Sequence, residues 1–316
     1  MQNRSKMTMK GLFTLSVIGV IAISNTAATN EQFPSEITVH PDLSYSEENP
    51  DLTLQLYLPK LTEERVPCVI VIQGGGFSAA AGNRLRSTAN YLAENGFAAA
   101  MIAYRGRPDH QCFDTVADTK TAVRYIRKIS AEYPIDPDRI GAVGRSAGAT
   151  LTALLAVTGG VDTFEGKGGH SEFSSSIQAG VAFAGVFDFV ARFTDPRQIE
   201  LQNHIENIIK RNEEWIGTPF SPESDLWKIV SAINHVEPND APILFLHCKN
   251  DATVPWLQSQ IMYEKMRDVG IEAEITYYET GGHGFQLEEP NQPLAEMVEF
   301  FKVHLTPDNA GSAPAE

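Results

Sequence analysis

Cysteine is scarce in this chain, with only Cys68, Cys112 and Cys248 among its 316 residues. No two of them form a CxxC pair and no histidines cluster around them, so a structural zinc site is not supported. None lies in a constrained turn beside a basic residue, as a thiolate nucleophile would require. Because the count is odd, at least one thiol has no partner within the chain, and the sequence leaves open whether the other two form a disulfide.

Basic residues are also few, because 25 Lys and Arg face 40 Asp and Glu and give a formal net charge of −15. A field of this sign repels phosphate backbones, so nucleic acid is not expected as a partner. The stretch Gly74-Gly75-Gly76-Phe77 does not fit a phosphate-binding loop, since it lacks both the GxGxxG pattern and a following Gly-Lys-Ser/Thr. We therefore expect no cofactor and no metal, and nothing in the sequence indicates an oligomeric state.

The apolar run at residues 11–23 is too short to span a bilayer comfortably. It follows Arg4, Lys6 and Lys10 and precedes small residues at 22–28, which is the pattern of a cleavable export signal. We expect a signal peptide over 1–30 and a secreted or periplasmic protein without a stable membrane anchor, with an uncleaved anchor as the alternative. Residues 31–305 would form a single domain, and the small polar residues 306–316 a disordered tail.

Strand and helix patterns alternate along most of the chain. The residue patterns predict strands at 52–58, 69–72, 97–104, 140–143, 177–186, 243–247 and 274–278. Helical patterns occupy 84–95, 114–133, 149–157 and 294–305, and a polar helical segment at about 188–234 is expected to cap the site. Such an order implies an α/β fold with a mostly parallel sheet and helices on both faces. Ligands bind such sheets at the carboxyl ends of the strands.

Gly144-Arg145-Ser146-Ala147-Gly148 fits the pattern G-x-S-x-G. It follows a short apolar strand and opens a helix of small residues, which is the context of a nucleophile elbow. The sharp turn lifts the Ser146 hydroxyl above the sheet, and the two glycines leave room for strand and helix to pack closely. The alternative is an ordinary Gly/Ser turn at a helix N-terminus.

A serine hydroxyl is a weak nucleophile until a neighbouring base takes its proton. His283, in Gly281-Gly282-His283-Gly284-Phe285, follows the last predicted strand, and its flanking glycines leave the imidazole reachable. An acceptor must hold the far nitrogen of the ring in one tautomer. Asp251 follows the preceding strand and is expected to be this acid, with Asp188, after an earlier strand, as the rival.

The tetrahedral intermediate of acyl transfer needs hydrogen-bond donors for its oxyanion. The glycine loop after the first central strand can point backbone N–H groups inward, and the residue after the nucleophile supplies another. We expect the N–H groups of Gly75, Gly76 and Ala147 to serve.

Substrate contacts are expected from Phe77, Arg145 and Trp215. Core packing is the alternative for Trp215, and also for Phe220 and Trp227. Five arginines fall near the carboxyl end of the sheet and could attract uronate-bearing substrates, or form structural ion pairs: Arg84, Arg86, Arg105, Arg107 and Arg145.

These motifs occur together and in order, and as a set they resemble the secreted bacterial esterases grouped with hormone-sensitive lipase and the BD-FAE feruloyl and acetylxylan esterases. The resemblance covers roughly residues 35 to 305. It includes Tyr104-Arg105, the segment 135–140 and Asp251-Ala252-Thr253-Val254-Pro255 besides the elbow, the glycine loop and the His283 loop. Two departures are Gln73, where the family usually has His, and Cys248, where Gly commonly follows the His of its His-Gly-x-x-Asp motif.

The resemblance implies an α/β-hydrolase fold and carboxylic ester hydrolysis through Ser146, Asp251 and His283, without a cofactor. It also implies acetyl or feruloyl esters of plant polysaccharides as substrates. The alternatives are a broad short-chain carboxylesterase, a peptidase of the same fold, and a catalytically silent binding module.

Overall fold

The computed structural model describes residues 37–60, 64–80 and 84–306. The expected export signal at 1–30 lies outside the described residues, as does the tail from residue 307 onward. The described residues form one compact unit. No helix in the described ranges is long and apolar enough to cross a membrane.

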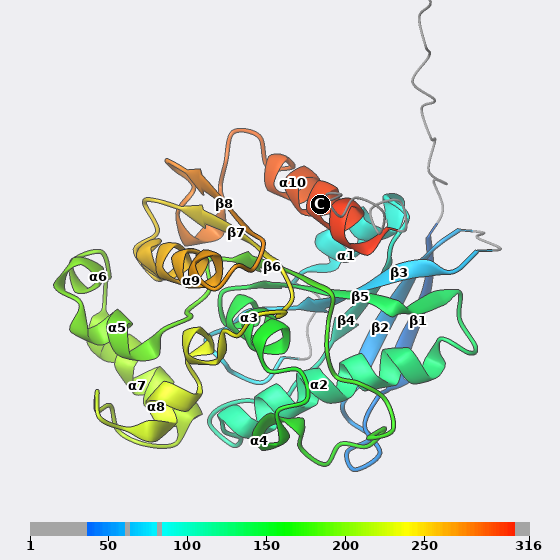
Figure 1. The fold of residues 1–316 in the computed structure, drawn as a ribbon, viewed down its shortest axis with the longest axis horizontal. Coiled ribbons are helices and arrows are strands. Elements are labelled where there is room, and N and C mark those ends of the chain that lie inside the picture. Colours follow the sequence, from blue (N-terminus) through cyan, green and yellow to red (C-terminus); the bar gives the residue numbers. More distant parts are fainter. Residues whose placement is uncertain (1–36, 61–63, 81–83, 307–316) are drawn as a thin grey trace, which may run out of the picture. The chain divides into compact units, whose positions relative to one another are not determined.

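The centre of this unit is an eight-stranded sheet (Figure 1). Its strand order is β1 (Ile37–Ser44), β2 (Thr53–Pro59), β4 (Ala98–Ile102), β3 (Val66–Ile72), β5 (Ile135–Arg145), β6 (Ala179–Phe183), β7 (Ile243–Cys248) and β8 (Ala273–Tyr278). The pairs β1–β2 and β2–β4 are antiparallel, and all later pairs are parallel. The fold is therefore the mostly parallel α/β-hydrolase sheet that the sequence predicts.

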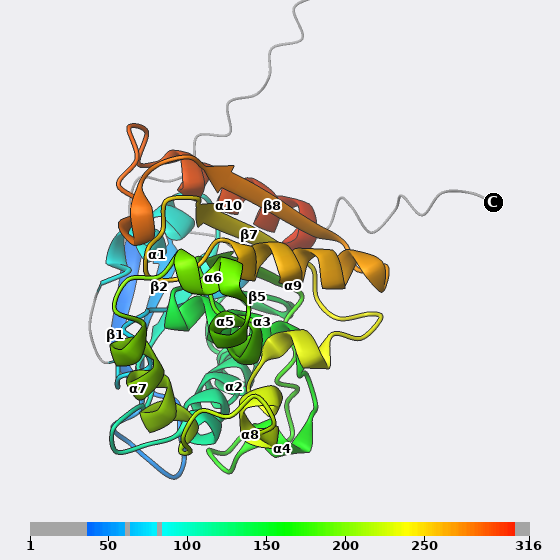
Figure 2. The same ribbon diagram turned by 90° about the vertical axis from the view of Figure 1, so that its left-hand side faces the viewer.

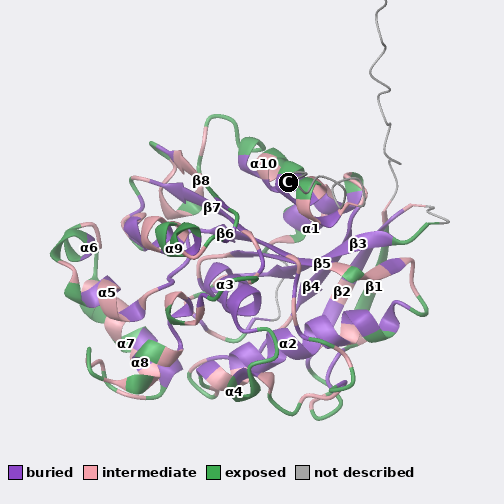
Figure 3. Cartoon of the chain, viewed as in Figure 1, coloured by how far each residue is buried: buried purple, intermediate pink, exposed green. Residues whose placement is uncertain are grey.

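Helices cover both faces of the sheet (Figure 1). On one face lie α1 (Arg86–Glu94) and α10 (Gln292–Leu305), and on the other lie α2 (Cys112–Ile129), α3 (Ala147–Val157) and α9 (Leu257–Asp268). The side chains of β3 alternate between the two faces. Val69 and Val71 join the core under α1 and α10, whereas Ile70 and Ile72 join the core under α2 and α3. Both faces of the central strands are thus buried, as Figure 3 shows, which accounts for their continuous apolar sequence.

Between β6 and β7 the chain forms α5 (Phe189–Thr194), α6 (Pro196–Glu200), α7 (Ile205–Ile216), α8 (Asp225–Ile229) and the 3₁₀ turn η1 (Ala232–His235). These helices gather on one side of the sheet and face the viewer in Figure 2. They correspond to the segment 188–234 that the sequence marks as a cap. A short helix, α4 (Asp162–Glu165), lies in the β5–β6 connection after α3.

Candidate active site

Ser146 stands at the junction of β5 and α3 with φ 55° and ψ −120°. A positive φ is uncommon for a residue with a side chain, and at this position it forms the sharp strand-to-helix turn of a nucleophile elbow. The turn is held by the Ser146 N–H, which donates to the Phe183 carbonyl at 2.8 Å. Only glycine fits beside it, because a Cβ on Gly144 would lie 2.1 Å from the Gly148 oxygen, and one on Gly148 2.0 Å from the Ile72 oxygen.

The His283 ring lies between Ser146 and Asp251. Its Nδ1 is 2.7 Å from Asp251 Oδ2, so Nδ1–H donates to the carboxylate. Its Nε2 is then free to accept from the Ser146 hydroxyl at 2.9 Å. The loop that carries the ring turns through Gly281 and Gly282, both at positive φ, and Gly282 N–H donates to Asn250 Oδ1 at 2.8 Å. The structure thus joins the three residues, from three separate loops, in a Ser-His-Asp arrangement.

Asp251 is buried and fully hydrogen-bonded. Its Oδ1 accepts from the N–H groups of Thr253 at 2.8 Å and Val254 at 3.0 Å. Its Oδ2 also lies 3.5 Å from Nε2 of His247, whose Nδ1 contacts Ser259 Oγ at 2.7 Å. Burial alone would raise the pKa of this carboxyl, but the hydrogen bonds from His247 and His283 outweigh it and hold the pKa well below its usual range.

The rival acid has a different role. Asp188 is the N-cap of α5, where its Oδ1 accepts from Val190 N–H at 2.9 Å and Ala191 N–H at 2.8 Å. A carboxylate in this position stabilises the first turn of a helix. The structure therefore brings Asp251, and not Asp188, to His283.

The glycine loop adjoins the elbow. Gly75, Gly76 and Phe77 all have positive φ, and a Cβ on Gly74 would lie 2.4 Å from the Arg145 oxygen. Gly76 and Ala147 line one small cavity together with Ser146, whereas Gly75 lines a neighbouring hollow with Gln73. As the first residue of α3, Ala147 has an N–H without an acceptor inside the helix. Gly76 and Ala147 are thus placed on the side of Ser146 where a carbonyl oxygen could be bound.

Two side chains brace the glycine loop. Tyr104 OH donates to the Gln73 carbonyl at 2.8 Å, and Arg107 Nε donates to the Gly76 carbonyl at 2.7 Å. Arg107 also pairs with Glu214 of α7 at 2.8 Å, which ties the loop to the cap. The Gln73 side chain itself is buried, and neither of its amide atoms finds a partner among the described residues.

The cavity at Ser146 has a volume of about 60 Å³. Its apolar wall includes Phe77, Val186 and Val254, and Arg192 and Asn212 add polar groups from the cap helices. Phe77, expected to contact substrate, therefore lies in the cavity.

Trp215 does not reach this cavity. Its ring is fully buried and stacks behind Phe77, with ring centroids 3.7 Å apart, while its Nε1 donates to Thr115 Oγ1 at 3.0 Å. Direct substrate contact by Trp215 is therefore wrong for this structure, because Phe77 separates it from the cavity. Trp227 is likewise fully buried.

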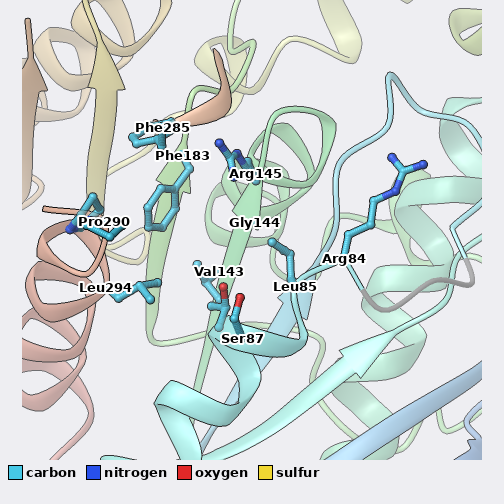
Figure 4. A pocket seen from close by; sticks show the side chains of 12 residues that line it. Arg84, Leu85, Ser87, Val143, Gly144, Arg145, Phe183, Phe285, Pro290 and Leu294 are labelled. Atoms are coloured by element: carbon cyan, nitrogen blue, oxygen red, sulfur yellow. The ribbon is translucent and has the colours of Figure 1, made fainter. Parts of the chain in front are cut away.

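Arg145 lines a second cavity of about 160 Å³ on the α1 and α10 side of the elbow. Figure 4 shows its guanidinium near Phe285, and Arg84 on the opposite rim. Arg145 Nη2 donates to the His283 carbonyl at 3.0 Å, and the guanidinium lies 5.1 Å from the centre of the Phe285 ring. This side chain therefore supports the loop that carries His283.

Four of the five arginines expected near the carboxyl end of the sheet fall into two pairs. Arg105 pairs with Asp118 at 2.7 Å and Arg107 with Glu214, so these two form structural ion pairs. Arg84 and Arg145 line the cavity of Figure 4. Arg86 does not line it.

Sequence reasoning missed two residues that contact these loops, His247 beside Asp251 and Arg192 beside Thr253. It placed Arg107 near the sheet edge but did not predict its contact with the Gly76 carbonyl. His247 gave a usable signal, because it stands at the end of the predicted strand 243–247, four residues before the acid. Arg192 gave none, since its contact depends on how the cap folds back.

Comparison with known proteins finds similarity to esterases. The chain is 28% identical over 228 residues to a probable carboxylic ester hydrolase, LipM, of Mycobacterium tuberculosis, covering 70% of this chain and 50% of LipM. It is 27% identical over 237 residues to a probable isoprenylcysteine alpha-carbonyl methylesterase of Arabidopsis thaliana, covering 75% of this chain and 49% of that protein. The chain thus spans about half the length of these two relatives.

Two solved structures share the fold over nearly their whole length. A truncated carbohydrate esterase from gut microbiota superposes with a TM-score of 0.75 at 26% identity, covering 88% of this chain and 99% of that one. An esterase of Thermogutta terrifontis gives a TM-score of 0.67 at 27% identity, with 89% and 96% covered. The profile of the BD-FAE family matches residues 54–266, more than half of the chain, and this chain therefore belongs to the BD-FAE family.

Proposed function

We propose that this protein hydrolyses carboxylic esters through a covalent acyl-enzyme on Ser146. The observation that carries the proposal is the hydrogen-bonded chain from Ser146 Oγ through His283 to Asp251. The similarity to esterases and carbohydrate esterases supports it. In this reaction His283 takes the Ser146 proton as Oγ attacks the ester carbonyl, and the N–H groups of Gly76 and Ala147, with Gly75 as a further candidate, stabilise the oxyanion.

The remaining steps, departure of the alcohol and hydrolysis of the acyl-enzyme, use the same groups. His283 gives its proton to the departing alcohol oxygen, which leaves the acyl group bound to Ser146. A water then attacks the acyl carbon while His283 takes its proton, and collapse of the second tetrahedral intermediate returns that proton to Ser146 and releases the acid. Asp251 remains ionised throughout and holds the ring in the tautomer with Nδ1 protonated.

The size of the cavity at Ser146 favours a short acyl group. An engineered protein cavity of about 150 Å³ holds one benzene ring. The cavity here, at about 60 Å³, has less than half of that volume, which suits acetyl better than feruloyl. A polar groove of about 400 Å³ adjoins it through Ile208, Arg211 and Thr253, and its further lining includes Asn203, His204 and Asn207. Such a groove could hold the sugar of an acetylated carbohydrate.

Labelling and substrate preference test the proposal together. A fluorophosphonate should attach to the peptide containing Ser146 in the wild type and not in Ser146→Ala, which should lose nearly all activity. An acetylated xylo-oligosaccharide and p-nitrophenyl acetate should be cleaved faster than methyl ferulate. An active Ser146→Ala enzyme would refute the mechanism, and faster cleavage of methyl ferulate would refute only the short acyl group. A wild type that takes the label on no serine would point to a silent binding module.

Export remains part of the proposal. If the signal expected at 1–30 is cleaved, N-terminal sequencing of protein from its own host should find a start between about Asn25 and Glu31. A start at Met1 would contradict it.

A further inference from the structure

Arg192, on α5 of the cap, carries a buried positive charge. Only 3% of its surface is exposed, and among the residues that the structure describes no carboxylate oxygen lies within 4.0 Å of its guanidinium. Its Nε donates to Gln202 Oε1 at 2.8 Å, and its Nη2 donates to the Thr253 carbonyl at 2.6 Å. Burying a cation costs free energy unless nearby polar or negatively charged groups compensate it, so a buried arginine at this place needs a structural explanation.

Thr253, which accepts a hydrogen bond from Arg192, also donates one to Asp251. Thr253 gives its carbonyl to Arg192 and its N–H to Asp251 Oδ1 at 2.8 Å. One residue, Thr253, therefore connects the guanidinium to the carboxylate. Burial lowers the pKa of Arg192 to about 9 and the nearby Asp251 charge opposes that shift, so the guanidinium remains protonated at neutral pH.

A second contact joins the same two segments. Asn203 N–H donates to the Ala252 carbonyl at 2.8 Å, so the cap holds two consecutive carbonyls of the loop after Asp251. Gln202, the residue before Asn203, is bound to Arg192. Its Oε1 accepts from the Arg192 guanidinium, and its Nε2 donates to the Arg192 main-chain carbonyl at 3.1 Å. The segment from Arg192 to Asn203 thus forms a brace along the acid loop.

We propose that Arg192 is a positioning residue for Asp251, which fixes the acid loop through the Thr253 carbonyl and supplies a buried positive charge close to the triad. The inference rests on the proposed function. It gives the cap a part in assembling the triad, beyond covering the substrate.

The other groups around the triad do not duplicate this role. On the far side of Asp251, His247 lies with Nε2 3.5 Å from Oδ2 and shares its ring nitrogens with Ser259 and the Val254 carbonyl. Behind His283, Arg145 donates to the main-chain carbonyl of His283 but is only partly buried. Cys248 is a buried thiol whose pKa is raised to about 11 by burial, so it is neutral. Arg192 is therefore the fully buried cation of this set.

Arg127 provides a matched control. It is also buried, at 9% exposure, its pKa is also lowered by burial, and its guanidinium also donates to backbone carbonyls, those of Ser174 at 2.6 Å and Ser176 at 2.7 Å. It lies on α2 and contacts no residue of the triad loops. Loss of a buried, carbonyl-bound arginine is common to both sites, but proximity to Asp251 belongs to Arg192 alone.

The test is the pH profile of kcat/KM for p-nitrophenyl acetate in Arg192→Met, Arg192→Lys and Arg127→Met. Removing the cation should favour protonation of the base, so the midpoint of the acid limb should rise by about half a pH unit in Arg192→Met. Its kcat should fall by about tenfold or more with a smaller change in KM. Arg192→Lys should restore the midpoint, and Arg127→Met should leave it unchanged.

An unmoved acid limb in Arg192→Met would overturn the proposal, as would an equal shift in Arg127→Met. A raised KM with unchanged kcat would also overturn it, because it would make Arg192, which lines the Ser146 cavity, a substrate contact instead. If Arg192→Met does not fold, Arg192→Gln offers a second neutral side chain for the same comparison. A wild type without esterase activity would refute the proposed function, whereas an active wild type with an unmoved limb would refute only this inference.

Discussion

At the scale of single residues, two carboxylates have similar local hydrogen bonds but different partners across space. Asp251 accepts from His283 Nδ1 and from two backbone N–H groups of its own loop, whereas Asp188 accepts from two N–H groups at the start of α5. Each carboxylate accepts from the N–H groups two and three residues further along the chain, so the local turn is alike at both. Only the partner across space separates a candidate catalytic acid from a helix cap.

This difference predicts how the two Asn variants will behave. Asp251→Asn should lower kcat strongly, by about 10⁴ as in the serine-protease template, because an amide favours the wrong imidazole tautomer. Asp188→Asn should keep kcat within a few fold, since Asn caps a helix about as well as Asp. Steady-state kinetics on p-nitrophenyl acetate would measure both, and the reverse ranking would contradict the assignment.

Acid stability provides a second readout for the Asp251 variant. The pKa of Asp251 is lowered in the folded protein, so its contribution to stability is present above the unfolded value of about 3.9 and is lost as pH falls below it. The difference in unfolding free energy between wild type and Asp251→Asn should therefore be largest near neutral pH and shrink in acid. A difference that stays constant from pH 7 to pH 3 would argue against a depressed pKa.

The three triad residues could be read from the sequence because each lies at a strand end beside glycine or in a short motif. Trp215 could not be placed the same way, because composition alone does not tell a cavity wall from the layer behind it. Phe77 lies between Trp215 and the cavity, and that order is fixed only by the packing of α7 against the glycine loop. The contact of Arg192 with the Thr253 carbonyl could not be predicted either, because it also depends on how a cap helix packs.

At the scale of elements, the loop between β3 and α1 is held through its backbone. Tyr104 OH, at the end of the β4 segment, donates to the Gln73 carbonyl, while the Gln73 amide has no partner in the described part of the chain. Gln73 stands where the family usually has His, so its side chain is the part of this loop that departs from the family pattern. The structure shows that the brace uses the Gln73 main chain, which any residue supplies.

A pair of variants separates main chain from side chain. Tyr104→Phe leaves a buried carbonyl unsatisfied and should cost about 1–3 kcal/mol of stability, with a clear loss of kcat as the loop relaxes. Gln73→Leu removes an unpartnered amide and should leave the stability equal or higher, with kcat within a few fold. Thermal unfolding and kinetics of both proteins would check this. A Gln73→Leu protein less stable than Tyr104→Phe would show that the amide has a partner of its own, such as a buried water.

Most elements follow from the sequence, and the exceptions have physical causes. The central strands are continuous apolar runs because both of their faces are buried. Strand β1 went unpredicted because it is an exposed edge strand, interrupted by Pro41 and by a register shift between His40 and Leu43. Helix α9 also went unpredicted, since only a narrow stripe that includes Leu257, Met262 and Met266 is buried on an otherwise polar helix.

At the scale of the whole molecule, different functional groups gather at the two ends of the sheet's strands. The triad loops follow the carboxyl ends of β5, β7 and β8, which is where parallel sheets bind ligands. Near the start of β8, Glu272 and Glu274 meet His304 of α10, with potential ligand atoms within 4.8 Å of one another. This cluster therefore lies at the opposite end of β8 from His283.

That separation predicts the effect of a chelator. The proposed ester hydrolysis through Ser146 uses only protein groups and water, so EDTA should leave kcat/KM for p-nitrophenyl acetate within about twofold. Glu274→Gln, which removes a ligand from the distant cluster, should behave as wild type in the same assay. Strong inhibition by EDTA that added Zn²⁺ or Ca²⁺ reverses would contradict a purely serine-based reaction.

The three thiols have a practical consequence. Cys68, Cys112 and Cys248 are all free and buried, and burial raises the pKa of Cys112 to about 12 and that of Cys248 to about 11. A thiol in this state reacts with a disulfide or maleimide reagent only when the surrounding chain opens. Cys68 sits in the central β3, Cys112 begins α2, and Cys248 ends β7 beside the acid loop. Their separate labelling rates would therefore report, without any engineering, whether the sheet centre, the α2 layer and the end of β7 beside Asp251 open together or one at a time.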